Sequence, residues 1–311
     1  MTNKAPVKLS VNNGFMMKRW PEPQIWADLI AQELEITDVQ FSLDLVNLEF
    51  GAKSLGPATR EILTACAQSG IEISSVFSGL GHYCQNLMSH PEKGRRLEAF
   101  EQYKLAIDFT AALGVDTFGG HMGAMSVRDH GDEARRAALH DELMELVEQL
   151  ALHAEGAGLK HLLWEPMPVA REWPSTLEEC HELSAKMQKL PGAQLGLCLD
   201  VGHCCRYDLG GEDSDPYRWV RELAHVSPII HLQQTDGTRD YHWPFTEANN
   251  EIGIIHPEPL HEAIAQAENS VITHLTFEVF PAFEQPDDAV ILDMKASCDY
   301  WRGCEIVNEQ K

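Results

Sequence analysis

Basic residues are scarce in this chain of 311 residues, which carries 24 lysines and arginines against 48 aspartates and glutamates. The formal net charge is therefore −24 at pH 7. Proteins that bind nucleic acids or anionic membrane surfaces do so largely through clustered basic side chains. The densest basic clusters here are short, such as those at 93–96 and 135–136. We therefore expect neither a nucleic acid nor a membrane as a partner.

Long hydrophobic runs are also missing. No stretch reaches the roughly 18 apolar residues that a membrane-spanning helix needs. The first residues, MTNKAPVKLSV, lack the apolar core of a secretory signal peptide. The eight cysteines form no CxxC pair, which argues against a zinc ribbon or a redox-active disulfide. These absences predict a cytoplasmic protein with reduced thiols.

What the sequence does contain is a regular alternation of short apolar segments with longer amphipathic ones. The short segments predict buried parallel strands at 7–11, 38–43, 71–77, 117–121, 159–165, 194–200, 228–233 and 272–279. Each is followed by helical periodicity, at 23–34, 57–69, 93–113, 132–156, 175–188, 215–224, 257–267 and 286–303. Ser175 is the predicted N-cap of the fifth helix, with Glu178 completing a capping box.

Eight successive strand–helix units in a chain of this length predict a (β/α)8 TIM barrel. The alternative is a doubly wound open sheet, and the lack of a GxGxxG motif after the first strand argues against its dinucleotide-binding form. No linker rich in proline, serine or glycine divides the chain, so we expect one barrel domain over residues 1–311. The irregular stretch 235–256 is too long for a simple connection and predicts a functional loop.

Titratable residues stand at the carboxyl ends of the last five predicted strands: His121, Glu165, Asp200, His231 and Glu278. In a TIM barrel these strand ends meet on the face that carries the active site. Burying several charges on one face costs free energy unless the charges are paired or bind a metal. A single strand-end carboxylate is commonly a helix cap or an ion-pair partner, but the agreement of several strands favours a common site.

Four of these residues form a set of three carboxylates and one imidazole. Hard oxygen donors with one nitrogen suit Mn²⁺, Mg²⁺ or Co²⁺, and they also accept Zn²⁺. We therefore expect Glu165, Asp200, His231 and Glu278 to bind one divalent metal ion.

The sequence around these positions resembles the xylose-isomerase-like TIM-barrel superfamily. The motifs that carry the resemblance are WEPM at 164–167, LDVGH at 199–203, HLQQTD at 231–236 and FEVF at 277–280. The superfamily includes tagatose/psicose 3-epimerases, hydroxypyruvate isomerase, inosose dehydratase and endonuclease IV. Segments nearer the N-terminus are similar to tetrulose-phosphate (erythrulose phosphate) 3-epimerases: RWPEPQIW, VQFSLDL, FSGLGHY and GGHMG. The resemblance spans the chain and implies the same barrel fold.

The resemblance also implies an activity, that of a metal-dependent ketose or ketose-phosphate 3-epimerase or isomerase with a tetrulose phosphate as leading substrate. In the epimerases a ketose binds the metal through its carbonyl O2 and its O3 hydroxyl, and one glutamate removes the C3 proton to give a cis-enediolate. A second glutamate returns a proton on the opposite face, because inversion needs a base and an acid on different sides. Glu165 and Glu278 are the implied catalytic pair and are metal ligands as well.

Further residues are candidates for binding the substrate. The resemblance places His203, three residues after Asp200, near the O1/O2 end of the sugar, and it places Arg239 near a substrate-binding arginine. Arg171 stands where the epimerases tend to have a glutamate. A cation at that position favours an anionic group such as a phosphate, and Lys18 is a second candidate to bind it.

His82, His121 and His242 are the remaining histidines near predicted strand ends or in the long loop. In endonuclease-like relatives the position of His121 can bind a further metal, to which His82 and His242 would contribute. The simpler interpretation is that these histidines are polar residues lining a substrate pocket. We therefore retain His82 and His121 as candidates for substrate binding.

Other activities use the same residues. Aldose–ketose isomerisation of a free sugar and inosose-type dehydration proceed through the same enediolate, so the sequence does not separate them from epimerisation. A DNA-repair endonuclease would need a basic groove, which the charge balance opposes. A non-catalytic sugar-binding or metal-storage barrel is a fourth interpretation. Relatives are commonly dimers or tetramers, so the resemblance implies a homo-oligomer.

Overall fold

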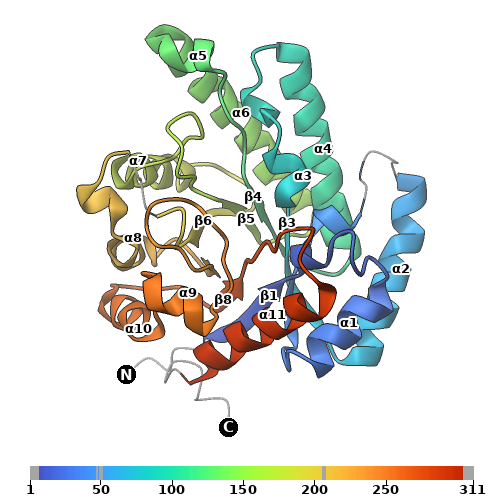
Figure 1. The fold of residues 1–311 in the computed structure, drawn as a ribbon. Helices are drawn as coiled ribbons and strands as arrows, with labels where there is room; N and C mark the ends of the chain where they lie inside the picture. Colours follow the sequence, from blue (N-terminus) through green and yellow to red (C-terminus); the bar gives the residue numbers. More distant parts are fainter. Residues whose placement is uncertain (1–6, 47, 49–51, 205–207, 304–311) are drawn as a thin grey trace.

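The computed structural model describes residues 7–46, 48, 52–204 and 208–303. Eight parallel strands close into a barrel in the order of the chain, and the helices surround it (Figure 1). The strands are β1 (Lys8–Asn12), β2 (Asp38–Ser42), β3 (Glu72–Phe77), β4 (Thr117–Gly120), β5 (His161–Trp164), β6 (Gln194–Asp200), β7 (Ile229–Leu232) and β8 (His274–Phe277). The predicted (β/α)8 barrel is confirmed.

Eight of the helices connect successive strands or follow the last one, as predicted. They are α1 (Pro23–Gln32), α2 (Ala52–Ser69), α4 (Lys93–Ala112), α6 (Glu133–Ala157), α7 (Leu177–Met187), α8 (Pro216–Leu223), α10 (Pro257–Gln266) and α11 (Asp287–Arg302). Three short helices were not predicted, because each spans less than two turns and shows no periodicity: α3 (Gly79–Tyr83), α5 (Val127–Gly131) and α9 (Glu247–Ile252). All three lie in loops at the carboxyl ends of strands.

Two predicted helix starts are wrong. Helix α2 begins at Ala52 and contains Pro57, which we had expected to open it. Proline has no backbone N–H, so Pro57 costs the helix one intrahelical hydrogen bond. The helix tolerates this loss near its start and begins five residues before the proline. The N-cap of α7 is Thr176, whose side chain accepts a hydrogen bond from the backbone N–H of Glu179. The predicted box of Ser175 and Glu178 therefore lies one residue too early.

The barrel interior has an apolar part and a polar part. Phe77, Leu163, Cys198 and Ile229, which come from four strands, form a small buried apolar cluster of their own. Buried polar side chains join the remaining strands, such as Ser10 of β1 and Thr276 of β8, whose hydroxyl oxygens lie 2.6 Å apart. The large apolar core packs between the strands and the surrounding helices, with Trp26, Trp219 and Trp301 fully buried.

The strand register brings the strand ends to one level. Asp200 at the end of β6 pairs with His231 of β7, and Leu232 of β7 pairs with Phe277 of β8. Glu278 therefore follows directly after the last paired residue of β8. Within the described ranges, none of the helices is both long enough and apolar enough to cross a bilayer.

The capping of α7 gives a test of its start. Thr176→Ala removes the side-chain oxygen that accepts from Glu179, and we expect it to lower the free energy of unfolding by about 1 kcal/mol. Thr176→Ser keeps the hydroxyl and should stay within a few tenths of a kcal/mol of the wild type. Urea denaturation followed by circular dichroism measures both. Equal stability of the two variants would contradict the assignment of the cap.

Candidate metal centre and active site

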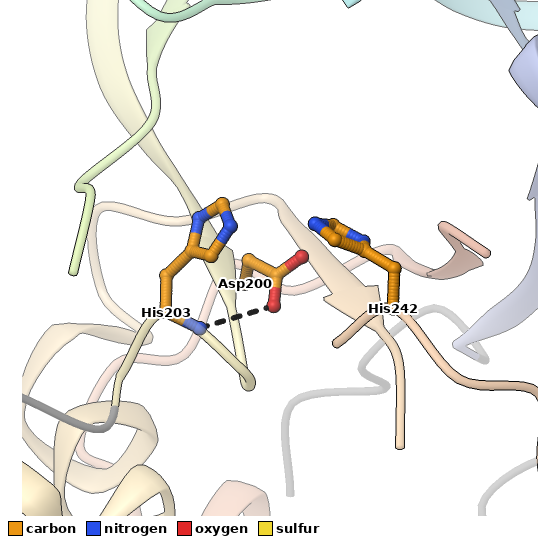
Figure 2. Close-up of side chains that lie close together, drawn as sticks. All are labelled: Asp200, His203 and His242. Carbon is orange, nitrogen blue, oxygen red and sulfur yellow. Dashed lines mark hydrogen bonds between the residues drawn. The ribbon is translucent and has the colours of Figure 1, made fainter. Parts of the chain in front are cut away.

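Asp200, the last residue of β6, has one oxygen bound by the local backbone and one that is not. Its Oδ1 accepts hydrogen bonds from the backbone N–H of Gly202 at 2.6 Å and of His203 at 3.3 Å (Figure 2). The side-chain amide of Gln233 donates to the same oxygen at 3.0 Å. Oδ2 is buried and has no hydrogen-bond partner among the described residues. The turn after β6 thus holds the carboxylate with one oxygen available.

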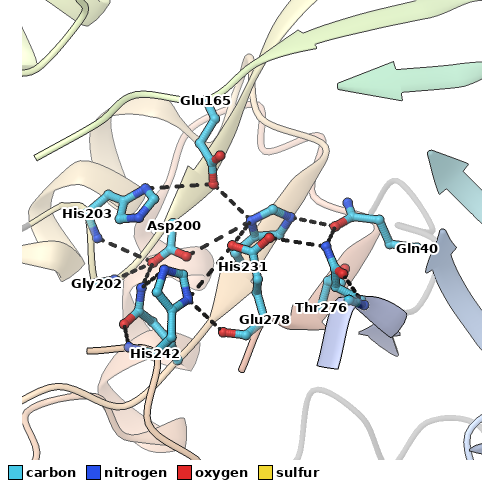
Figure 3. A network of polar contacts seen from close by, with 12 residues as sticks. Gln40, Glu165, Asp200, Gly202, His203, His231, His242, Thr276 and Glu278 are labelled. Atoms are coloured by element: carbon cyan, nitrogen blue, oxygen red, sulfur yellow. Dashed lines mark hydrogen bonds and ion pairs between the residues drawn. The ribbon is translucent and has the colours of Figure 1, made fainter. Parts of the chain in front are cut away.

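The available oxygen belongs to a cluster of four side chains from neighbouring strands (Figure 3). Glu165, Asp200, His231 and Glu278 are all buried, and one potential ligand atom from each lies within 4.8 Å of the others. His231 Nδ1 lies 3.0 Å from Glu165 Oε1, 3.0 Å from Glu278 Oε2 and 4.0 Å from Asp200 Oδ2. The structure therefore brings together the four residues that the sequence predicts as metal ligands.

The two glutamates of the cluster are held by the strand ladders. Glu165 directly follows β5, and its backbone N–H donates to the carbonyl of Gly120 on β4. Glu278 directly follows β8, and its N–H donates to the carbonyl of Leu232 on β7 at 2.9 Å. Because the ladder hydrogen bonds continue past the strand ends, the backbone at both residues is fixed by its neighbours.

Burial and mutual repulsion shift the pKa values of the carboxylates. Burial raises the pKa of Glu165, and the negative charge of Glu278 raises it further. Burial also raises the pKa of Asp200. Burial opposes the charged form of Glu278 too, but the neighbouring His231 outweighs it and lowers the pKa of Glu278 to about 2. Burial thus opposes the charged form of Glu165 and Asp200, and a nearby cation would favour it.

These observations fit a divalent cation. Three buried carboxylates and an imidazole are a hard donor set of the kind that binds Mg²⁺, Mn²⁺ or Co²⁺. The unpartnered Oδ2 of Asp200 is costly in the absence of a positive partner. Glu165, Asp200, His231 and Glu278 could therefore hold one metal ion, whose identity the donor set does not specify.

A second group of potential ligands shares Asp200. Asp200, His203 and His242 also offer one ligand atom each within 4.8 Å of one another (Figure 2). Asp240 connects the two histidines, with 3.2 Å between His203 Nε2 and Asp240 Oδ2 and 3.2 Å between His242 Nε2 and Asp240 Oδ1. Gln233 Nε2 donates to Asp240 Oδ1 at 2.7 Å. Asp240 was missed by the sequence analysis, because it lies in the long loop 235–256 and follows no strand.

Asp240 changes the charge of the histidines on either side of it. Burial disfavours the protonated form of His203, but Asp200 and Asp240 outweigh burial and raise its pKa well above the usual value. Burial likewise lowers the pKa of His242, and Asp240 raises it, to a net value of about 9. Burial opposes ionisation of Asp240, yet the two histidines hold its pKa well below the usual range. Asp240 thus favours the protonated form of both histidines that flank it.

A cavity opens beside these clusters. Both proposed catalytic glutamates border it, whereas Asp200 and His231 do not. Its lining consists of Phe77, Ser78, Gly79, Leu80, Tyr83, His121, Glu165, Met167, His203, Asp240, His242, Glu278 and Phe280. The cavity thus combines an apolar wall with titratable groups from the strand ends and from the long loop.

Two of the predicted substrate-binding residues line this cavity, His203 and His121. The ring of His121 is fully buried, and neither of its nitrogens has a hydrogen-bond partner among the described residues. Burial lowers its pKa to about 3, so the imidazole is neutral. The edge of the ring meets Tyr83, with 5.5 Å between ring centroids. A neutral histidine in this position can donate or accept a hydrogen bond from a ligand.

The other four predicted substrate-binding residues do not border the cavity. His82 Nδ1 lies 2.9 Å from the carbonyl oxygen of Ser78, and Arg171 Nη1 donates to the carbonyl of Met125 at 3.0 Å. Arg239 is exposed, and the ammonium group of Lys18 lies 3.9 Å from the ring centroid of Phe283.

A buried glutamate next to Arg171 was also missed. Glu172 is 7% exposed, its Oε2 has no hydrogen-bond partner among the described residues, and burial raises its pKa. The epimerases tend to have a glutamate at the position of Arg171, and in this chain the glutamate follows one residue later. The sequence analysis therefore did not single it out. Its unpartnered oxygen makes it a further candidate for contact with a ligand.

Comparison with known proteins agrees with this geometry. Residues 30–293 match the family model described as xylose isomerase-like TIM barrel. D-erythrulose 1-phosphate 3-epimerase of Brucella abortus (strain 2308) is 30% identical over 301 residues, which cover 94% of each chain.

Solved structures give the same result. A protein of Rhodospirillum rubrum ATCC 11170, provisionally named a xylose isomerase, is 29% identical with a TM-score of 0.88 and covers 96% of this chain and 99% of its own. D-Psicose 3-epimerase of Clostridium cellulolyticum H10, solved with D-tagatose, shares the fold at 14% identity and a TM-score of 0.72, covering 96% and 99%. The chain therefore belongs to the xylose isomerase-like TIM-barrel family.

Proposed function

We propose that the protein is a divalent-metal-dependent ketose or ketose-phosphate 3-epimerase, with erythrulose phosphate as its leading substrate. The observation that carries the proposal is the convergence of Glu165 and Glu278 on His231 and Asp200 beside a cavity that both glutamates line. An isomerase-type activity is supported by the family match and by the relative that is named D-erythrulose 1-phosphate 3-epimerase.

Glu165, Asp200, His231 and Glu278 would hold the metal. A bound divalent ion supplies a Lewis acid that polarises the ketose carbonyl and makes the neighbouring C–H bond more acidic. The apolar side chains of the cavity wall, which include Phe77, lower the local polarity and so strengthen the electrostatic interactions there.

The two glutamates that border the cavity would transfer the protons. One carboxylate removes the proton from C3 of the ketose to leave an enediolate, and the other donates a proton to C3 on the opposite face. Glu165 comes from β5 and Glu278 from β8, so two other strands separate them around the barrel. Because epimerisation is reversible, each glutamate is the base for one of the two epimers.

The charged groups that line the cavity bear on whether the ketose carries a phosphate. No lysine or arginine is part of the described lining, and the positive groups that border the cavity are His203 and His242. A phosphate would therefore contact these histidines or lie outside the lining. This observation also favours a second candidate, a free ketose. Aldose–ketose isomerisation and inosose-type dehydration on the same residues are further alternatives.

Solvent labelling separates these activities. Metal-stripped protein should be inactive toward a panel of free and phosphorylated ketoses, and Mn²⁺, Mg²⁺ or Co²⁺ should restore turnover. In D₂O, we expect deuterium at C3 of the ketose, measured by NMR. Deuterium at C1 would instead indicate aldose–ketose isomerisation. Full activity after complete metal removal would contradict the proposed metal dependence.

Substitution of the glutamates tests the proton transfer. Glu165→Gln and Glu278→Gln keep the side-chain shape but remove the proton-accepting oxygen, so each should lower kcat by several orders of magnitude at saturating metal. Glu145→Gln, at an exposed position on α6, is the matched control and should keep the wild-type rate. Thermal melting checks that all three variants fold. A near-normal rate in either active-site variant would rule out the two-carboxylate mechanism.

Three further expectations stay predictions: a single domain over residues 1–311, a homo-oligomer of two or four copies, and a cytoplasmic location. Size-exclusion chromatography with light scattering measures the oligomeric state directly.

A further inference from the structure

Two buried amide side chains, Gln40 and Asn12, lie next to the candidate metal cluster, where Gln40 faces His231 and Asn12 faces Glu278. Gln40 of β2 places its Oε1 2.8 Å from His231 Nε2 and 2.8 Å from Asn12 Nδ2 (Figure 3). Gln40 and His231 have no exposed surface, and Asn12 is 2% exposed. Buried polar groups of this kind are fixed by their hydrogen bonds, since water cannot replace a lost partner.

The orientation of Asn12 follows from the backbone. Its Oδ1 accepts a hydrogen bond from the N–H of Gly14 at 2.8 Å, as the cap of the short 3₁₀ helix Asn13–Met16. The Nδ2 group, with two hydrogens, is then directed at Gln40 Oε1 and at Glu278 Oε1, the latter at 3.1 Å. Rotating the amide by half a turn would place its oxygen against a carboxylate oxygen, which is repulsive.

The orientation of Gln40 follows from that of Asn12. Because Asn12 presents a donor, Gln40 must present its oxygen, and its Nε2 lies 3.3 Å from the hydroxyl of Ser75. An amide oxygen accepts hydrogen bonds and cannot donate them. The nitrogen of His231 that faces Gln40 must therefore carry a hydrogen. In the neutral imidazole, the lone pair is then on Nδ1, the atom that faces Glu165 and Glu278.

We propose that Gln40, held by Asn12, is a positioning residue that fixes His231 as the Nε2–H tautomer and directs its Nδ1 lone pair at the metal ion. The inference rests on the metal site of the proposed function. Asn12 positions a second ligand of the set as well, because it binds Oε1 of Glu278 and leaves Oε2 on the side of the cluster. With Nε2–H held by Gln40, metal binding displaces only the hydrogen of Nδ1 and needs no reorientation of the ring, which raises metal affinity.

The first measurement is the affinity of the metal-stripped protein for Mn²⁺, by isothermal titration calorimetry. Gln40→Met keeps the approximate volume but removes the acceptor, and we expect its Kd to rise by about 10- to 100-fold, the usual effect of losing such a partner. Gln40→Glu restores an acceptor to His231 Nε2 and should recover most of the affinity.

The matched control is Thr276→Val. Thr276 lies beside His231 in the strand register, and its hydroxyl pairs with Ser10 inside the same barrel. The substitution removes one buried hydrogen bond without touching Gln40, so the Kd for Mn²⁺ should not change even where the melting temperature falls. An equal loss of affinity in Gln40→Met and Thr276→Val would overturn the proposal.

The second measurement reads the tautomer directly in the wild type, so it does not depend on a variant that folds. The Mg²⁺-loaded protein is labelled with ¹⁵N-histidine, and the His231 ring signals are assigned by their loss in His231→Gln. Long-range ¹H–¹⁵N spectra should show a hydrogen on Nε2 and none on Nδ1. A hydrogen on Nδ1 in the metal-loaded protein would overturn the proposal.

The two proposals fail in different ways. Unchanged metal affinity in Gln40→Met, with ketose turnover intact in the wild type, overturns the role of Gln40 and leaves the function standing. The expected difference between Gln40→Met and Gln40→Glu, with no turnover of any ketose, supports the role of Gln40 and overturns the function.

Discussion

Three carboxylates buried at one end of a closed barrel require a positive charge, and the rest of the site is arranged around that requirement. Asp200 keeps one oxygen for the cluster because its other oxygen is saturated by backbone N–H groups and Gln233. Asn12 does the same for Glu278 by binding one of its oxygens. In each case hydrogen bonds from the protein hold one carboxylate oxygen, and the other oxygen faces the cluster. Both carboxylates therefore direct one oxygen at the cluster, as a ligand set for a divalent cation requires.

The convergence of the four candidate ligands could be predicted from the sequence because all four stand at the carboxyl ends of predicted strands. Parallel strands in a barrel bring their carboxyl ends to one face, so residues such as Glu165 and His231 meet whatever the details of packing. Asp240 could not be predicted, since its position depends on the path of a long loop, whereas His242 of the same loop was among the histidines expected to line the pocket. Gln234 and Trp243 form an antiparallel bridge that helps to set the path of this loop. The sequence around them has no regular spacing of apolar residues from which this bridge could be predicted. The expectation that this loop is functional agrees with its place beside the cavity.

Gln40 and Asn12 were missed for a different reason. Gln40 lies within a predicted strand and Asn12 directly follows one, but a strand pattern does not show whether a polar side chain faces the interior of the barrel or the surrounding helices. Lys18, Arg171 and Arg239 were predicted to bind the substrate, but none of them borders the cavity. Charge and sequence position do not give the direction in which a side chain points. Lys18 lies over the ring of Phe283, and Arg171 binds a loop carbonyl. Sequence reasoning is therefore strongest for groups on the strand ends and weakest for the loops that select the substrate.

The hydrogen bond between Asn12 and Glu278 joins residues separated by 266 positions, because β1 and β8 are neighbours in the closed barrel. The two ends of the polypeptide must therefore both be present, and side by side, before the ligand set is complete. A chain still being synthesised has no complete set of candidate ligands until its eighth strand leaves the ribosome. Protein truncated before that strand lacks Glu278 and, with it, the carboxylate that binds Asn12.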